Sequence, residues 1–214
     1  MMKWIVCGLL TGILAGTSLI AGQPAATASA SQRDVLIVVD IQNFYFPGGM
    51  MPLENSQAAA AQAARLQQEF RAKKWPVIHV RHVPPQVSNA DKDPQYAIHS
   101  VVKPLLGEKV VDKHFANSFR ETELLAHLKA LQVRRVVICG MQTHMCVEAA
   151  TRAAADYGFD VVLAGDACAT RKLDYGGSEV AAAQVQTAVL ASMDGNYARV
   201  VTVDKLLAEM STVK

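Results

Sequence analysis

The chain has 214 residues, of which 51% are hydrophobic and 19% are charged, and its formal net charge at pH 7 is +2. This length is enough for one domain with a full hydrophobic core. A charge this close to zero excludes electrostatic attraction as the basis for binding nucleic acid or an anionic membrane. We therefore expect one domain that binds neither nucleic acid nor, once its N-terminal segment is removed, a membrane.

The N-terminal segment predicts export. Lys3 precedes an apolar run over residues 4–21, and small residues over 28–30 follow a stretch rich in Pro, Ala, Thr and Ser. This order is typical of a secretory signal peptide. An uncleaved membrane anchor is the alternative, but small and polar residues interrupt the run and no stop-transfer pattern follows. We expect a signal peptide over residues 1–30 and a domain over 31–214 that is periplasmic or secreted.

Three cysteines stay in the predicted mature chain: Cys139, Cys146 and Cys168. Their odd number and their spacing match neither a disulfide framework nor a zinc motif. At least one thiol is therefore expected to be unpaired, and a free thiol in an oxidising compartment favours a chemical role.

The mature chain alternates strands and helices. Residues 35–39 are continuously aliphatic, as in a strand that is buried on both faces. The pattern predicts further strands over 77–80, 109–112, 136–139, 159–163 and 200–203, and helices over 56–70, 121–131, 143–157 and 178–190 with a short one at the C-terminus. This alternation indicates an α/β fold, with a mainly parallel sheet of about six strands and helices on both faces. The irregular segment over 84–100 is either a binding loop or a simple surface loop.

Three chemically useful residues follow different strands. Asp40 ends the first strand, Lys113 follows the third, and Cys146 lies in the first turns of the helix after the fourth. Ligands of parallel sheets bind at the carboxyl ends of the strands, so these side chains are expected to converge. A helix N-terminus stabilises a thiolate, which makes Cys146 a candidate nucleophile beside an acid and a cation. Taken singly, each residue is equally consistent with a turn, a solvated cation or a core thiol.

The residues from about 34 to 203 resemble the isochorismatase-like cysteine hydrolase family. The resemblance rests on an ordered set of motifs: Val39-Asp40-Ile41-Gln42-Asn43-Phe44, Asp112-Lys113-His114-Phe115 with Asn117-Ser118-Phe119, Gly140-Met141-Gln142-Thr143-His144-Met145-Cys146-Val147, and Asp166-Ala167-Cys168.

The resemblance implies a three-layer αβα fold, a catalytic triad of Asp40, Lys113 and Cys146, and a cis peptide between Met141 and Gln142. It also implies that the backbone amides of Gln142 and Cys146 form an oxyanion hole and, since relatives are often oligomers, that the protein is a homo-oligomer. We expect no cofactor. The activity expected from the chemistry and the resemblance is hydrolysis of a C–N bond in a small carboxamide, ureido or lactam-like substrate through a thioester.

Other residues are open to more than one interpretation. Gln42, Phe46 and His82 are predicted to bind substrate, and the aromatic residue is equally consistent with core packing. Relatives of the nicotinamidase type carry an Asp-x-His metal site, but the corresponding residues here are Val80-Arg81-His82. His79 and His82 without a carboxylate make a poor site for a hard metal, so no metal is expected.

Three other functions compete with amide hydrolysis. They are vinyl-ether hydrolysis of the isochorismatase type, binding without catalysis, and thiol redox chemistry. Cys146 argues against the first, and the absence of a Cys-x-x-Cys motif argues against the third. Cys139 is expected to be structural, and Cys168 to be core, pocket wall or an oxidation partner. His144 lies near the nucleophile, but because Asp40 is the proposed base we assign it no catalytic role.

Overall fold

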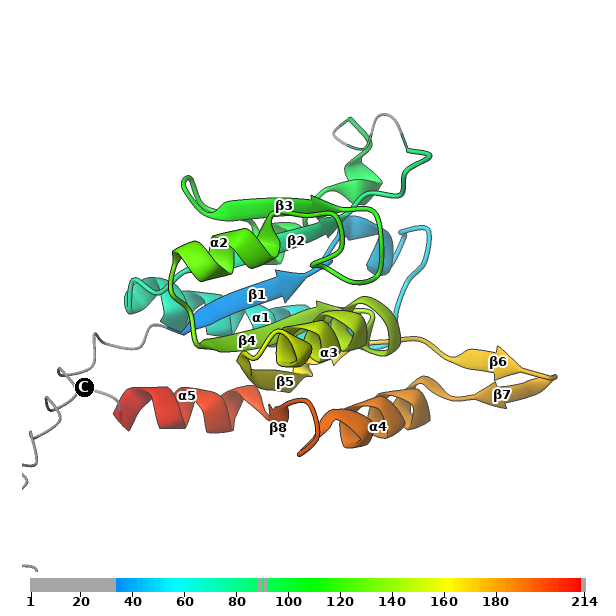
Figure 1. Ribbon diagram of the computed structural model, residues 1–214. Helices are drawn as coiled ribbons and strands as arrows, with labels where there is room; N and C mark the ends of the chain where they lie inside the picture. The colour runs from blue at the N-terminus through cyan, green and yellow to red at the C-terminus, as the bar shows by residue number, and fades with distance from the viewer. Residues whose placement is uncertain (1–33, 88–89, 91, 213–214) are drawn as a thin grey trace, which may run out of the picture. The chain divides into compact units, whose positions relative to one another are not determined.

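The computed structural model describes residues 34–87, 90 and 92–212 (Figure 1). The chain divides into two units, Met1–Ala30 and Ser31–Lys214, and all described residues belong to the second. The predicted signal peptide lies outside the described residues and stays a prediction.

Six strands form one parallel sheet in the order β3-β2-β1-β4-β5-β8. From β1 the chain adds strands towards one edge, and from β4 it adds them towards the other, so the strand order reverses between β1 and β4. In parallel α/β sheets this switch point is where ligands bind, at the carboxyl ends of the strands. The strands are β1 (Val35–Val39), β2 (Val77–His82), β3 (Lys109–Lys113), β4 (Arg135–Met141), β5 (Asp160–Ala169) and β8 (Arg199–Val201).

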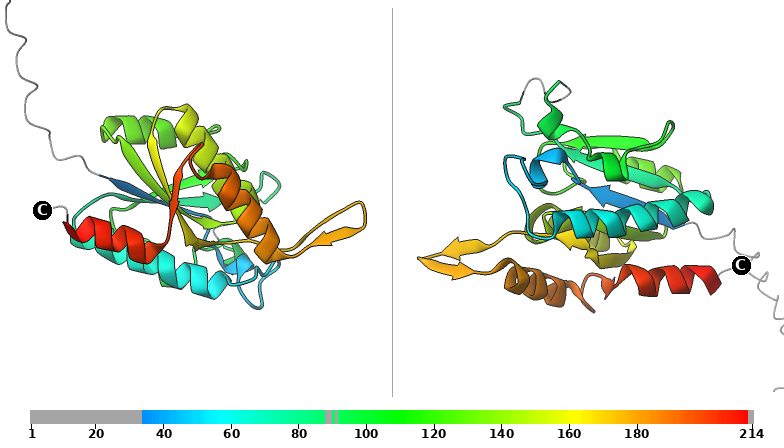
Figure 2. Two further views of the ribbon diagram at one scale, coloured as in Figure 1. Left: turned by 90° about the horizontal axis from the view of Figure 1, so that it is seen from below. Right: turned by 180° about the vertical axis from the view of Figure 1, so that it is seen from behind.

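Helices cover both faces of the sheet and complete the expected αβα arrangement. Helices α1 (Ser56–Ala72) and α5 (Val203–Thr212) lie on one face. Helices α2 (Leu124–Ala130), α3 (Glu148–Asp156) and α4 (Ala182–Met193) lie on the other, as Figure 2 shows. Large apolar side chains of α1 and α2 are fully buried against the sheet, which separates two hydrophobic cores. The predicted fold class is confirmed.

The segment after β5 differs from the sequence prediction. A two-stranded antiparallel hairpin, β6 (Leu173–Tyr175) and β7 (Ser178–Val180), extends from the rest of the unit (Figures 1 and 2). The helix predicted over 178–190 therefore begins only at Ala182. Gly176 and Gly177 both have positive φ, the conformation that a two-residue hairpin turn requires. The glycine pair was a sequence signal that the helical interpretation overlooked.

Short turns complete the part of the chain near the carboxyl ends of the strands. They are η1 (Asn43–Tyr45), η2 (Pro94–Tyr96), η3 (Ser100–Val102) and the π-helical turn η4 (Thr143–Val147), which leads into α3. In residues 34–87, 90 and 92–212, no helix combines the length and the apolar character needed to cross a bilayer.

Candidate active site

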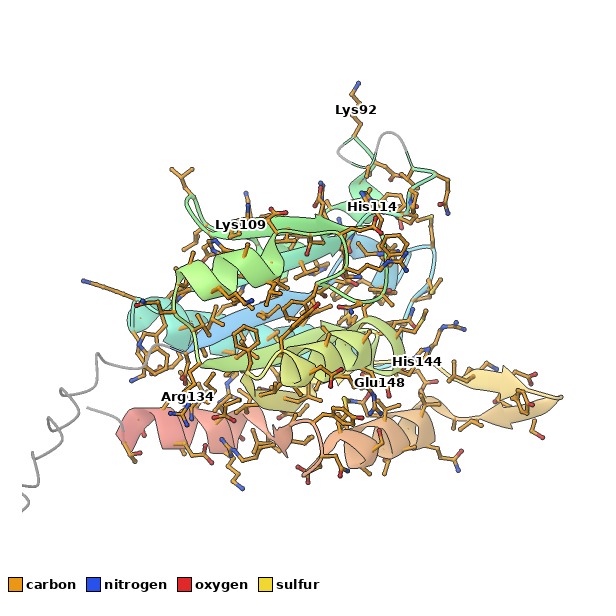
Figure 3. The ribbon with its side chains drawn as sticks, viewed as in Figure 1. Lys92, Lys109, His114, Arg134, His144 and Glu148 are labelled. Carbon is orange, nitrogen blue, oxygen red and sulfur yellow. The ribbon has the colours of Figure 1, made fainter. Side chains whose placement is uncertain are left out.

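Strand ends bring the predicted residues to one rim of the sheet. In Figure 3, His114 and His144 mark this rim, and Lys109 and Arg134 mark the opposite end of the strands. The backbone at Asp40 has φ of 50°, a left-handed conformation that Asp tolerates better than most residues. Gly140 faces Val39 on the neighbouring strand, and a Cβ there would lie 1.9 Å from the Val39 carbonyl oxygen. Only glycine lets β1 and β4 approach so closely beside Asp40.

Asp40 and Lys113 form a fully buried ion pair. The Lys113 Nζ lies 2.8 Å from the Asp40 Oδ2, and both side chains are 0% exposed. The Lys113 Nζ also donates to the Phe115 carbonyl oxygen at 3.1 Å and lies 3.3 Å from the His82 Nδ1. Burial alone would lower the pKa of Lys113, but the neighbouring Asp40 and Cys146 raise it above its ordinary value. The raised pKa favours the charged form of Lys113 beside Asp40.

The Cys146 thiol lies against both members of this pair, close enough to interact with the Asp40 and Lys113 side chains. Burial and the Asp40 carboxylate raise the pKa of Cys146 to about 12, while Lys113 opposes the shift. The expectation that a helix N-terminus stabilises the thiolate was therefore wrong for the free protein. Cys146 lies inside the turn η4, not at the start of a regular helix, and desolvation outweighs the helix end.

The peptide bond between Met141 and Gln142 is cis, as the resemblance implied. The Gln142 Nε2 donates to the Tyr45 hydroxyl at 3.3 Å, and the Gln142 Oε1 accepts from the Arg171 Nε at 3.1 Å. These bonds fix the side chain that follows β4. That the amides of Gln142 and Cys146 bind an oxyanion stays a prediction.

A cavity of about 330 Å³ opens over the thiol. This volume suits a small molecule. The lining consists mainly of aromatic and methionine side chains, from the segment after β1, the segment after β2 and the turn η4. The lining residues are Phe44, Tyr45, Met50, Met51, His82, Pro84, Tyr96, Ala116, Gln142, Met145 and Cys146.

Two predicted substrate-binding residues lie elsewhere. Phe46 is buried and stacks on His99 with ring centroids 3.7 Å apart, so it belongs to the core. The Gln42 amide donates to the carbonyl oxygens of His82 and Tyr96 and accepts from the His82 N–H. Gln42 therefore holds two backbone segments together and is not part of the cavity lining. The third residue, His82, does line the cavity.

His79 and His82 lie on opposite faces of β2 because side chains alternate along a strand. The His79 Nε2 contacts the Glu108 Oε2 at 3.1 Å and the Gln67 Nε2 at 3.3 Å, on the face that α1 covers. The two histidines therefore do not share a site. Within the described part of the chain, no group of three or more His, Cys, Asp or Glu side chains is placed to hold a metal ion.

The cysteines of the described unit are free thiols. Cys139 lies in the core beneath α1 and α5, which fits the expected structural role. Cys168 lines a separate cavity against α4, and its thiol donates to the Ala164 carbonyl oxygen. His144 lies 2.5 Å from the Thr170 hydroxyl, measured from its Nδ1.

Sequence reasoning missed most of the apolar lining. Tyr96 lies in the irregular segment over 84–100, so its position in a possible binding loop was a usable signal. Met50 and Met51 follow the glycine pair Gly48-Gly49 and carry no pattern that predicts a pocket.

The six-stranded parallel sheet with helices on both faces, and the Asp40, Lys113 and Cys146 side chains at the carboxyl ends of its strands, are features that this chain shares with a family of hydrolases. The sequence matches the Isochorismatase domain over residues 34–205, and the chain belongs to the isochorismatase family. It is 39% identical to the uncharacterized isochorismatase family protein YddQ of Bacillus subtilis, over 80% of this chain and 97% of that protein. The solved structure of an isochorismatase from Pseudomonas putida matches with a TM-score of 0.77 and 32% identity, over 81% and 90% of the two chains. A cysteine hydrolase from Pseudomonas syringae matches with a TM-score of 0.79 and 25% identity, over 84% and 93%.

Some relatives carry names that state an activity or a location. The chain is 30% identical to a streptothricin hydrolase of Streptomyces noursei, over 75% of this chain and 64% of that protein. It is 33% identical to nicotinamidase 3 of Arabidopsis thaliana, over 29% and 32%. It is 32% identical to the secreted isochorismatase effector Isc1 of Verticillium dahliae, over 71% and 80%.

Proposed function

We propose that the protein is a cysteine-dependent amidohydrolase that cleaves a C–N bond of a small carboxamide or ureido substrate through a thioester on Cys146. The observation that carries the proposal is the contact of the Cys146 thiol with Asp40 and Lys113, beside a cavity of small-molecule size. The relatives named streptothricin hydrolase and nicotinamidase support amide cleavage as the reaction class.

The first half-reaction begins from a neutral thiol. Because the pKa of Cys146 is raised to about 12, its proton passes to the Asp40 carboxylate as the sulfur attacks the substrate carbonyl carbon. The C–S bond forms and the carbonyl oxygen becomes an oxyanion, to which the N–H groups of Gln142 and Cys146 donate. Such a donor contributes about 3 kcal/mol. The C–N bond then breaks, and the proton from Asp40 moves to the leaving nitrogen.

The second half-reaction restores the thiol. Asp40 takes a proton from a water molecule, and the resulting hydroxide attacks the thioester carbon. The C–S bond breaks, the sulfur recovers the proton from Asp40, and the acid leaves. Lys113 makes no bond to substrate in this scheme: it orients the carboxylate through the 2.8 Å ion pair and offsets negative charge on the sulfur.

Ammonia release from a panel of primary amides and ureido acids tests this proposal. We expect Cys146→Ala to reduce release to background, because no other group of the site can form the acyl intermediate. Cys168→Ala is the matched control, since this thiol is buried but lines a different cavity, and it should retain activity. Undiminished release by Cys146→Ala would contradict the proposal.

Three further measurements on the wild type and Cys146→Ala separate the competing functions. Release of an enol or pyruvate from a vinyl ether, without loss in Cys146→Ala, would favour isochorismatase-type chemistry. No turnover of any class together with tight binding would favour a binding protein. Reversible pairing of Cys146 with Cys168 would favour thiol redox chemistry.

We further propose that the protein acts after export, as a homo-oligomer. The N-terminal segment has the features of a secretory signal, and one relative is a secreted effector. An isolated two-stranded hairpin is only marginally stable, and Tyr175 on the β6–β7 hairpin is 89% exposed, so a second copy is a suitable partner for this arm. Cell fractionation and light scattering of the mature protein test the two points.

A further inference from the structure

The mouth of the cavity is lined by exposed methionines. Met50 is 60% exposed, Met51 42% and Met145 44%, and all three border the same cavity. They come from two segments far apart in the sequence, the segment after η1 and the turn η4. Exposed apolar side chains that gather around a cavity mark a binding surface, and methionine adapts its shape to flat, polarisable groups.

The walls below this mouth are aromatic. Phe44 packs on Tyr45 with centroids 4.1 Å apart and on Tyr96 at 5.7 Å, so the three rings support one another. All three line the cavity. Rings that are held in this way offer fixed apolar surfaces to a planar ligand.

The cavity offers no counter-ion. Among the residues that the structure describes, the lining includes no Asp, Glu, Lys or Arg. Asp40 and Lys113 lie behind the thiol and neutralise each other. Arg171 is not among the lining residues, and its Nε donates to the Gln142 Oε1 at 3.1 Å. A carboxylate on the substrate would lose its water here without a charged partner, which is costly.

His82 gives the lining one oriented polar group. The Lys113 ammonium has only donors, so at 3.3 Å the His82 Nδ1 is the acceptor and the ring proton lies on Nε2. Burial and Lys113 both lower the pKa of His82, which keeps the ring neutral. The Gln42 bonds to its backbone hold the residue in place. His82 thus supplies a neutral N–H donor.

From these observations we propose that the substrate is an uncharged amide with a planar apolar body, which packs between the methionine mouth and the aromatic walls, and with an acceptor atom for the His82 Nε2–H. This inference rests on the proposed function and names its substrate class. It favours aromatic carboxamides and cyclic amides over ureido acids and other anionic amides.

A matched pair of probes tests the substrate class. Benzamide and 4-carbamoylbenzoate share one ring and one amide and differ by a carboxylate, and acetamide lacks the ring. We expect kcat/KM for ammonia release from benzamide to exceed the other two by about tenfold or more. Equal or faster cleavage of 4-carbamoylbenzoate, or of acetamide, would overturn the inference while leaving amide hydrolysis intact.

Charge placed at the mouth gives a second test. Met50→Glu should raise KM for benzamide about tenfold with little change in kcat, because Met50 contacts the body of the substrate and not the reacting atoms. Leu106→Glu is the matched control: Leu106 is fully exposed and lines no cavity described above, so it should leave both constants unchanged. Equal changes in KM for Met50→Glu and Leu106→Glu would contradict the placement of the substrate against Met50.

Binding separates this inference from the proposed function. Calorimetry with Cys146→Ala protein should show benzamide binding that Met50→Glu weakens and that 4-carbamoylbenzoate does not match. Such binding without turnover in the wild type would remove the amidohydrolase and keep the apolar pocket. Turnover at equal kcat/KM for benzamide and 4-carbamoylbenzoate would keep the amidohydrolase and remove the preference for an uncharged substrate.

Discussion

Two clusters of ionisable groups lie on the same sheet, and they differ in burial and in how their carboxylates are bonded. The rim cluster consists of Asp40, Lys113 and Cys146. The helix-face cluster consists of Arg71, His79 and Glu108, on the face that α1 covers.

In the helix-face cluster the carboxylate is saturated. Arg71 donates to both Glu108 oxygens, at 2.7 and 2.8 Å, and His79 and the Leu105 N–H also contact the Oε2. Arginine does not give up its proton in proteins, and His79, the other side-chain partner of Glu108, is 1% exposed and lies outside the lining of the cavity over Cys146. Such a cluster stabilises the fold.

In the rim cluster the carboxylate contacts a thiol, which can lose its proton, and the thiol borders a cavity. A carboxylate paired with a cation is common to both clusters, so an ion pair alone does not mark a catalytic site. A nucleophilic thiol that itself borders a cavity distinguishes the rim cluster, since Arg71, His79 and Glu108 include no such group.

The largest expected effect comes from Asp40→Asn, which removes the proton acceptor. We predict a fall in kcat/KM of about a thousandfold or more on the best amide substrate. Because Asp40 raises the pKa of Cys146 and Lys113 lowers it, the same substitution should also increase the rate of thiol alkylation near neutral pH. Slower alkylation together with lost activity would indicate a damaged site and not a lost base.

Lys113→Met should reduce stability strongly. It leaves the Asp40 carboxylate buried without a partner, and breaking a buried ion pair in this way costs about 3–5 kcal/mol. Urea unfolding followed by circular dichroism measures the change. The double variant Asp40→Asn with Lys113→Met should recover part of the loss, and a double variant no more stable than Lys113→Met would argue against the pairing.

Glu108→Gln should cost less, about 1–3 kcal/mol, because Arg71 and His79 lose a charged acceptor but keep an amide oxygen. The kcat/KM of this variant should equal that of the wild type, since Glu108 lies on the α1 face and outside the cavity lining. A large change in kcat/KM at unchanged stability would contradict the conclusion that the helix-face cluster serves stability and not catalysis.

The smallest expected effect is a pH dependence of the stability that Glu108→Gln loses relative to the wild type. Burial raises the pKa of Glu108, but the hydrogen bonds from Arg71, the Leu105 N–H and His79 lower it further, to below its ordinary value of 4.5. A depressed carboxyl pKa contributes stability above the unfolded-state value, and this stability is lost as the pH falls through the folded-state value. The stability difference between wild type and Glu108→Gln should therefore shrink in acid. A difference that grows on acidification would contradict the assigned direction.

The sequence predicted the elements that local pattern determines. The aliphatic run of β1 was placed with its observed bounds, and positions directly after strands identified Asp40, Lys113 and Cys146 as neighbours. The start of α4 was predicted too early, because residues 178–180, which the prediction placed in the helix, pair with β6 across the glycine turn.

Properties that depend on tertiary packing could not be predicted from the sequence. The helix-face cluster joins residues that are far apart in the sequence, and the methionine mouth depends on where two loops meet. The sequence predicted a lowered pKa for Cys146, but burial and Asp40, which act only in the folded protein, raise it. Gln42 was assigned to the substrate, but the backbone groups that occupy its amide cannot be read from the motif.

Acyl transfer to hydroxylamine tests the central claim, a thioester on Cys146, most directly. The measurement uses two amides that share an acyl group but differ in their amine, and compares the ratio of hydroxamate to acid. If both form the same thioester, the ratio is the same for the two substrates, and no hydroxamate forms with Cys146→Ala. Hydrolysis that yields no hydroxamate, or ratios that differ between the amides, would contradict a common acyl-enzyme on Cys146.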